Sequence, residues 1–423
     1  MRIVDIKKDK YNLHFIKTNK FKTTLVKVIF SNNLKKEELT IRNLLLNNLL
    51  FSSAKYNTLR KMAIKKDDLF GIDLYSKTYK RGSLALSEIS LTALSDKYTE
   101  KGSLKKGLEF MFDIINNPNT KDNKFDEVAF KINYDRLKTS IINEEDDPMF
   151  CAYKGFKEMI GNDKIYGTSS LGTIKDLEKI TPSSLYNYYK KFLSENQIDI
   201  YVVGNFNEKE IEKVFENNIN WTNKNSSYQN KIGNYEKDFS CKEIESKFNQ
   251  SKIIMGGNIN NLTEHEKLYD GIIYNIILGN SPNSKLFQNV REKYSLAYSI
   301  SSSINRLEGS FFIYAGISYD NVDKTKQEIY KQIEDMKQGK FLKKDVKDAK
   351  QAILSIMKEI DEYPGSMLDH YMNYLYFGNE KLVIQKEEIN KITKEDIVRV
   401  ANKINIDTIF VLKEETNGKN KSK

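Results

Sequence analysis

The 423-residue sequence is poor in the residues on which disulfide frameworks and membrane spans depend. Its two cysteines, Cys151 and Cys241, make neither a disulfide framework nor a metal-binding pattern. No apolar run reaches the roughly 18 residues that a spanning helix requires, so no membrane association is expected. Residues 1–15 have no unbroken apolar stretch and no small-residue cleavage site, so a secretory signal is not expected. These absences predict a reduced, cytoplasmic setting.

Histidine is also scarce, and His14, His265 and His370 are the only three. None lies within one helical turn of another, so no two imidazoles are spaced to hold a catalytic metal. The acidic stretch 143–148 (NEEDDP) could bind a hard cation, but no glycine-containing ligand loop follows it. We interpret it as a solvated helix end. Glycine-rich phosphate loops, nucleophile elbows and CxxC motifs are absent from the sequence as well.

The formal net charge of +10 raises the question of nucleic-acid binding. Most of the positive charge is lysine, which contacts phosphate as a point charge, whereas base recognition favours the planar fork of arginine. The lysines are interleaved with acids, as in 65–70 (KKDDLF) and 386–396 (KEEINKITKED), and form no basic block. We therefore interpret the charge as a solvated surface and expect no nucleic-acid partner.

Hydrophobic periodicity indicates both helices and strands. Apolar residues recur at three-to-four spacing in eight segments, which predicts helices over 37–65, 101–117, 125–143, 182–194, 264–279, 320–338, 342–360 and 393–404. Alternating segments predict strands over 22–30, 83–94, 198–204, 252–259 and 309–318. Hairpin-like strands mixed with helix pairs indicate an α+β fold with largely antiparallel sheets.

A polar stretch divides the chain. Residues 223–240 are rich in Asn, Ser and Lys and show no periodicity, so we interpret them as a linker. The predicted domains are then 1–222 and 241–412. The tail, 413–423, is expected to be disordered.

The two predicted domains end alike. Residues 180–204 and 392–413 each give an Ile-Thr helix start, a short amphipathic helix, an Asn-containing turn and a strand that opens with Ile-Asp. Thr181 and Thr393 are natural helix N-caps, and Pro182 occupies the favoured first helical position. This shared ending predicts an internal duplication, with two homologous halves that each layer a mostly antiparallel sheet with helices.

Four segments carry a resemblance to a known family. In the first half they are the acidic turn 143–149 (NEEDDPM), the segment 169–193 (SSLGTIKDLEKITPSSLYNYYKKFL) and the strand 198–206 (IDIYVVGNF). In the second half, 284–304 (SKLFQNVREKYSLAYSISSSI) is the most specific. Together they resemble the insulinase-like (pitrilysin) zinc metallopeptidases, whose second-half signature is S-x-L-F-x-x-x-R-E-x-x-x-L-A-Y. The resemblance covers nearly the whole chain.

The resemblance implies that the zinc site of the family is lost here. That family binds zinc through an H-x-x-E-H motif on its first helix and a later glutamate, because positions i, i+3 and i+4 share one helical face. Alignment on Phe51 places Leu44, Asn47 and Asn48 at the three motif positions, and the later glutamate falls on Ser140. We therefore expect no zinc on this chain and no activity from the chain alone. The two asparagines are expected to face a cavity; the alternative is an exposed stripe of an amphipathic helix.

The resemblance also implies that one functional pair is kept. Arg291 and Tyr298 match the arginine and tyrosine that in this family bind substrate carbonyls and stabilise the oxyanion. In two-chain members, one subunit supplies the zinc and the other supplies this pair. The alternatives are a surface arginine paired with Glu292 and ordinary strand packing for the tyrosine.

The implied function is that of a non-catalytic subunit. It would pair with a zinc-bearing homologue, close a chamber around an extended peptide, and bind that peptide at a sheet edge. Zinc is expected on the partner only. Two other functions stay open: a homodimeric peptide-binding or scaffold protein, and an active metallopeptidase with an unrecognised metal site.

Overall fold

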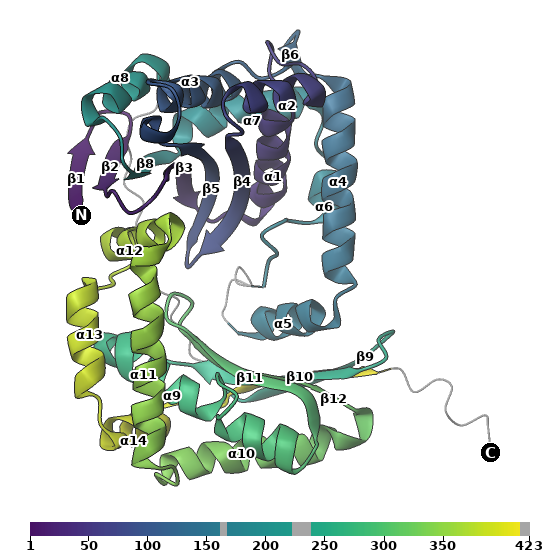
Figure 1. Ribbon diagram of the computed structural model, residues 1–423. Coiled ribbons are helices and arrows are strands. Elements are labelled where there is room, and N and C mark those ends of the chain that lie inside the picture. The colour runs from purple at the N-terminus through teal and green to yellow at the C-terminus, as the bar shows by residue number, and fades with distance from the viewer. Residues whose placement is uncertain (161–166, 222–237, 415–423) are drawn as a thin grey trace. The chain divides into compact units, whose positions relative to one another are not determined.

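The computed structural model describes residues 1–160, 167–221 and 238–414, and these form two compact units (Figure 1). Unit 1 holds 1–142, 169–221 and 359–376 of the described residues, and unit 2 holds 143–160, 167–168, 238–358 and 377–414. Each unit thus includes a helix from the other half of the chain: α12 (Pro364–Tyr376) belongs to unit 1, and α5 (Pro148–Met159) belongs to unit 2. The units are therefore not contiguous in sequence, unlike the predicted division at the linker.

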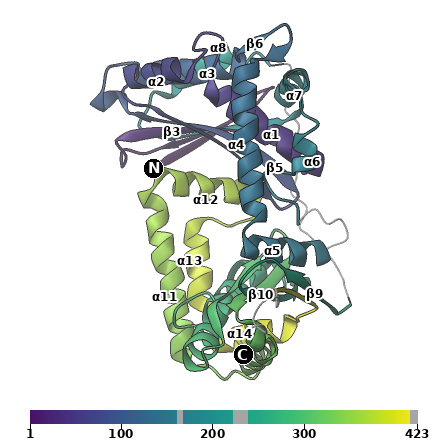
Figure 2. The ribbon, with the colours of Figure 1, turned by 90° about the vertical axis from the view of Figure 1, so that its right-hand side faces the viewer.

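Unit 1 is built on a six-stranded sheet with the order β1-β2-β8-β3-β5-β4. Its strands are β1 (Arg2–Lys7), β2 (Asn12–Lys17), β3 (Thr23–Asn33), β4 (Asp73–Arg81), β5 (Leu84–Leu94) and β8 (Gln197–Gly204). Its helices are α1 (Lys36–Phe51), α2 (Leu59–Asp68), α3 (Ser103–Asn116), α4 (Glu127–Glu145), α6 (Ile174–Leu177), α7 (Pro182–Glu195) and α8 (Glu208–Asn218), with a small hairpin of β6 (Thr120–Lys121) and β7 (Lys124–Phe125). Helices α3 and α8 lie on one side of the sheet and α12 lies on the other (Figures 1 and 2).

Unit 2 is built on a five-stranded sheet with the order β11-β12-β10-β13-β9. Its strands are β9 (Ser240–Ser246), β10 (Ser251–Asn258), β11 (Ala297–Asn305), β12 (Ser310–Ile317) and β13 (Thr408–Glu414). Its helices are α9 (Gly271–Leu278), α10 (Val322–Lys337), α11 (Lys343–Glu359), α13 (Leu382–Lys391) and α14 (Lys394–Lys403), with π-helices over Glu266–Asp270 and Phe287–Lys293. Helix α5 covers the sheet face opposite α9 and α10 (Figure 1).

The two sheets share one topology, which confirms the predicted fold class and the two homologous halves. In unit 1, β8 pairs parallel to β2 and antiparallel to β3, and β3, β5 and β4 continue antiparallel. In unit 2, β13 pairs parallel to β9 and antiparallel to β10, and β10, β12 and β11 continue antiparallel. Thr181 and Thr393 both cap their helices with complete capping boxes.

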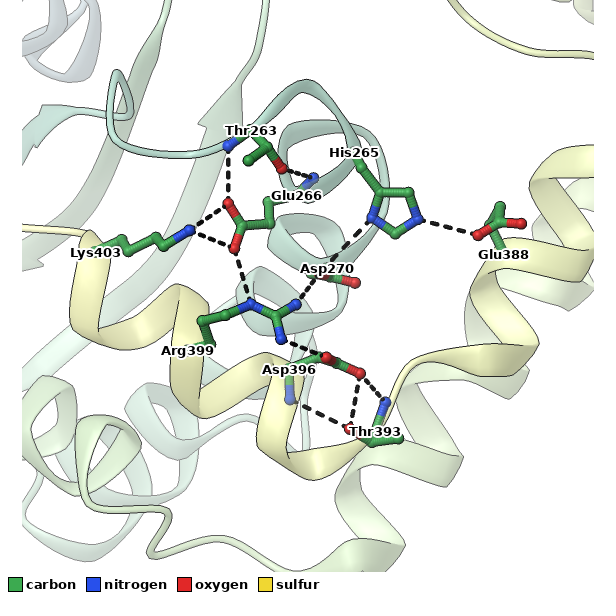
Figure 3. Close-up of polar contacts among 9 residues, drawn as sticks. All are labelled: Thr263, His265, Glu266, Asp270, Glu388, Thr393, Asp396, Arg399 and Lys403. Atoms are coloured by element: carbon green, nitrogen blue, oxygen red, sulfur yellow. Dashed lines mark hydrogen bonds and ion pairs between the residues drawn. The ribbon is translucent and has the colours of Figure 1, made fainter.

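The duplication extends to an ion pair between equivalent helices. In unit 2, Glu266 accepts from Lys403 Nζ at 2.7 and 2.8 Å and from Arg399 Nε at 3.0 Å (Figure 3). In unit 1, Glu38 of α1 accepts from Lys191 Nζ at 2.9 Å. Each lysine is the tenth residue after its capping threonine. Burial would raise the pKa of Glu266, but Lys403, the Thr263 amide and Arg399 outweigh it and hold that pKa at about 2.

Some predicted boundaries differ from the structure. The single helix predicted over 37–65 is two helices, α1 and α2, because the chain after Phe51 leaves the helix and Ser53 bridges to Pro118. Strand β13 continues to Glu414, which includes two residues expected in the disordered tail. Most of the predicted linker and the rest of the tail lie outside the described residues. No helix in the described part of the chain is long and apolar enough to cross a membrane.

Candidate functional site

Helix α1 carries three of the four positions that the sequence alignment assigns to the metal ligands and base of the family. Leu44 and Asn48 are one helical turn apart and buried, at 0% and 1% exposure, whereas Asn47 is exposed. The Asn48 amide nitrogen donates to the Leu44 carbonyl at 2.8 Å, and its side-chain oxygen has no partner among the described residues. Asn47 and Asn48 belong to the same i, i+3, i+4 face, but they point about 100° apart, and only Asn48 is enclosed by the protein. The prediction that both amides face a cavity is therefore wrong for Asn48, which is buried, and the exposure of Asn47 fits the alternative of an exposed helix face equally well.

The fourth position, Ser140, lies on α4. Its side chain is exposed, and its hydroxyl donates to the Arg136 carbonyl at 3.1 Å, one turn earlier in the same helix. This is the local bond that serine commonly makes in a helix. Ser140 contributes no carboxylate.

Arg291 and Tyr298 lie on adjoining elements of unit 2. Arg291 is on the π-helix Phe287–Lys293, with its guanidinium over the Phe287 ring at 4.6 Å and its side chain 43% exposed. Its Nε forms an ion pair with Glu292 at 3.6 Å, which is longer than a hydrogen bond, so the predicted alternative of a surface arginine near Glu292 remains open. Tyr298 is on β11 and is 66% exposed. Neither side chain supports the core of unit 2.

Strand β11 presents Tyr298 at the edge of its sheet. It is the last strand in the order β11-β12-β10-β13-β9, so one side of its backbone is unpaired within the sheet. The register with β12 shifts between Ala297 and Ser299, which makes Tyr298 the extra residue of a β-bulge. Bulges re-aim side chains and are frequent at sheet edges beside functional sites. An unpaired edge can accept a peptide as an additional strand, with main-chain hydrogen bonds for affinity.

Comparison with known proteins shows which proteins the chain resembles. A model of the peptidase M16 inactive domain matches residues 179–353. The probable inactive metalloprotease YmfF of Bacillus subtilis (strain 168) is 27% identical over 414 residues, 95% of each chain. An uncharacterized zinc protease of Rickettsia bellii (strain RML369-C) is 27% identical over 314 residues, 71% of this chain and 72% of that protein. The crystal structure of a conserved protein from Enterococcus faecalis V583 is 26% identical and superposes with a TM-score of 0.90 over 98% of this chain and 99% of that chain. The chain is therefore similar to the M16, or insulinase-like, metallopeptidases over nearly its whole length.

Zinc does not fit the residues that the sequence alignment assigns to the metal positions of this chain. Zinc in proteins takes imidazole, thiolate or carboxylate ligands. A leucine, two amides and a hydroxyl occupy the positions here, and the Asn48 amide is already bonded to its own helix. Within the described ranges, no three His, Cys, Asp or Glu residues are grouped to hold a metal ion. By its similarity to the M16 inactive domain and to a probable inactive metalloprotease, the chain is a homologue of inactive M16 proteins.

A buried polar cluster around His14 was not found from the sequence. On β2, His14 lies between two carboxylates: Nδ1 is 2.7 Å from Asp5, and Nε2 is 3.5 Å from Asp199. Two tyrosines of α12 donate to the same carboxylates at 2.5 Å, Tyr371 to Asp5 and Tyr376 to Asp199. The only sequence signal was Asp199, a lone carboxylate in the apolar strand IDIYVVG. The hydrogen bonds of this cluster connect α12 to the sheet of unit 1.

The His14 cluster predicts how the stability of unit 1 depends on pH. Burial alone would lower the pKa of His14, but hydrogen bonds and charges from Asp199 and Asp5 outweigh it, so the pKa is raised above its ordinary 6.5. The folded state then holds the proton more tightly than the unfolded state. The resulting stabilisation is complete below pH 6.5 and is lost as the pH rises through the folded-state pKa, with a slope of up to ~1.4 kcal/mol per pH unit. Urea unfolding from pH 6 to 9 measures this slope, and His14→Gln should flatten it. Equal slopes in both proteins would contradict the assignment.

Proposed function

We propose that this chain is a non-catalytic M16 subunit that pairs with a zinc-bearing homologue and binds extended peptides for cleavage by the pair. The observation that carries the proposal is a combination of two features in one chain. The helix α1 positions that hold zinc in the family carry no metal ligands, whereas Arg291 and Tyr298 are present and exposed. A cytoplasmic location stays a prediction.

The contribution of this chain would be to bind and polarise the substrate. A peptide added to the edge of β11 would run past the bulged Tyr298, whose hydroxyl can donate a hydrogen bond. The Arg291 guanidinium offers further donors in a planar fork. Two such donors directed at one substrate carbonyl would stabilise the negative charge that develops on its oxygen during hydrolysis. The partner would supply the metal and the attacking water.

The purified chain is expected to bind no stoichiometric zinc and to hydrolyse no peptide by itself. Co-expression with an M16 homologue that has an intact H-x-x-E-H motif should yield a complex that cleaves extended peptides. Metal analysis, size-exclusion chromatography with light scattering, and hydrolysis of a quenched-fluorescent peptide library measure these three properties. One tightly held zinc per isolated chain, lost together with activity on chelation, would show that a metal site lies elsewhere in the chain.

The scaffold alternative makes a different prediction. A second copy in place of a zinc-bearing partner would give a complex that binds peptides without cleaving them. A stable homodimer that binds the library peptides and forms no complex with any M16 homologue of its host would favour that alternative. A stable monomer at micromolar concentration with no partner would contradict both.

A further inference from the structure

A lysine-rich groove runs along the helical surface of unit 2 and is unrelated to Arg291 and Tyr298. It has a volume of about 790 Å³ and lies between α11 on one side and α13 and α14 on the other. Helices α11 and α13 lie side by side in both views (Figures 1 and 2), joined by a hydrogen bond from Lys350 to the Asn390 carbonyl at 2.8 Å. Val346, Leu354 and Ile392 supply apolar lining.

The charge of the groove is one-sided. Six lysines line it, and these are Lys343, Lys347, Lys350, Lys358, Lys386 and Lys394. The single carboxylate in the lining is Glu395. The whole chain has 68 basic and 58 acidic residues, so a sample of its average surface would hold nearly as many acids as lysines. The sequence-based interpretation of the positive charge, as lysines interleaved with acids on a solvated surface, is therefore wrong for this groove.

The lysines of α11 form one line along the helix. Lys343, Lys347 and Lys350 follow one another at helical spacing, and Leu354 and Lys358 continue the same face. Asp345 and Asp348 of the same helix do not line the groove. Lys343 and Lys347 are exposed and have no carboxylate partner within the described residues. A row of like charges without counter-charges is unfavourable by itself and becomes favourable when an anion lies along it.

We propose that this groove binds an acidic peptide segment of a partner protein, with apolar side chains against Val346, Leu354 and Ile392 and carboxylates toward the lysines. The undescribed segments of this chain are poor candidates because 222–237 and 415–423 each contain three lysines and one glutamate, and 161–166 has one aspartate and one lysine. A second copy carries the same net charge of +10. A nucleic acid is less favoured because the lining has neither arginine nor an aromatic residue on which a base could stack.

The test is the affinity of the full chain for a short fluorescein-labelled peptide of glutamate, leucine and alanine, measured by anisotropy at low ionic strength. The variant is Lys343→Glu with Lys347→Glu, two exposed lysines one turn apart on α11. Its matched control is Lys209→Glu with Lys213→Glu, two exposed lysines at the same spacing on α8. Each exposed ion pair contributes a factor of a few, and each reversal also adds repulsion, so the α11 variant should raise Kd on the order of tenfold. The control should change Kd by less than about twofold.

Four outcomes would overturn the proposal. They are no measurable binding of the acidic peptide, equal losses in the two double variants, and equal binding of a peptide with glutamine in place of glutamate. The fourth is tighter binding of a single-stranded oligonucleotide of equal charge that is also lost in the α11 variant, because it would assign the groove to nucleic acid. The proposal does not depend on the zinc-bearing partner, since the isolated chain is measured and no activity is read.

Discussion

Replacing Arg291 with alanine, or Tyr298 with phenylalanine, is expected to lower kcat/KM of the reconstituted complex on the order of 100-fold. Both side chains are exposed and remote from the core, so folding and partner association should be unchanged. The loss should appear in kcat, because a donor to the oxyanion acts most strongly in the transition state. Steady-state hydrolysis of one peptide by each purified complex, with light scattering to verify assembly, measures the effect.

Three controls make that result specific. Arg291→Lys keeps the charge but loses the planar fork, so it should restore activity only in part. Arg60→Ala and Tyr330→Phe remove an exposed arginine and an exposed tyrosine hydroxyl from other helices and should leave kcat/KM unchanged. A loss confined to KM would mean that the pair binds substrate equally in the ground and transition states. Unchanged kinetics would leave Arg291 as a surface residue near Glu292 and this subunit as a structural lid.

Five interior strands could be predicted from the sequence because both of their faces are covered, whereas the interior strand β2 was missed, since NLHFIK has no long apolar run. Strands β3, β5, β8, β10 and β12 are buried along almost their whole length, and their long apolar runs identify them. Strands β1 and β9, at the outer edges, are mostly exposed and have charged, irregular patterns, so periodicity gave no signal for them. The exchange of α5 and α12 between the units depends on tertiary contacts that no local pattern encodes.

In the candidate site, too, local features could be predicted from the sequence and nonlocal ones could not. The motif alignment could assign Leu44, Asn47 and Asn48 to one helix because helical spacing is a local property, and it stays a prediction that these and Ser140 are the metal positions. It could not say that Asn48 is buried, since that depends on what packs against α1. The His14 cluster joins β1, β2, β8 and α12, so residues far apart in the sequence meet only in the folded unit. Nonlocal polar networks of this kind leave almost no trace in a single sequence.

Helix α5, which comes from the first half of the chain and belongs to unit 2, carries a buried, charged lysine that contacts the rest of unit 2. Lys157 of α5 is fully buried, and its ammonium donates to Glu308 and, at 3.0 Å, to Ser310 Oγ. The rings of Tyr153 and Phe312 lie within 5.2 and 5.3 Å of the same nitrogen. Burial lowers the pKa of Lys157, and Glu308 counteracts this. The charge is therefore stable in this position only while Glu308 is present.

Glu308→Ala is accordingly expected to destabilise unit 2 by roughly 3 kcal/mol, because it leaves a buried ammonium without its counter-charge. Native-state hydrogen exchange of the β10 and β12 amides reports on unit 2 separately, which matters because a chain of two units need not unfold in one step. Asp323→Ala is the matched control: it removes a carboxylate 3.6 Å from Lys326 on the exposed surface and should change stability by less than about 0.5 kcal/mol.

The double variant Lys157→Met with Glu308→Ala separates the two explanations of such a loss. If the loss arises from the uncompensated charge, methionine fills the same space without a charge and the double variant should regain most of the stability. If Glu308 instead supports the turn between β11 and β12, the double variant should stay as unstable as Glu308→Ala alone. An equal loss in Glu308→Ala and in the double variant would therefore contradict the charge-based account. A double variant more stable than the unsubstituted chain would show that the buried pair holds α5 in position at a net cost in free energy.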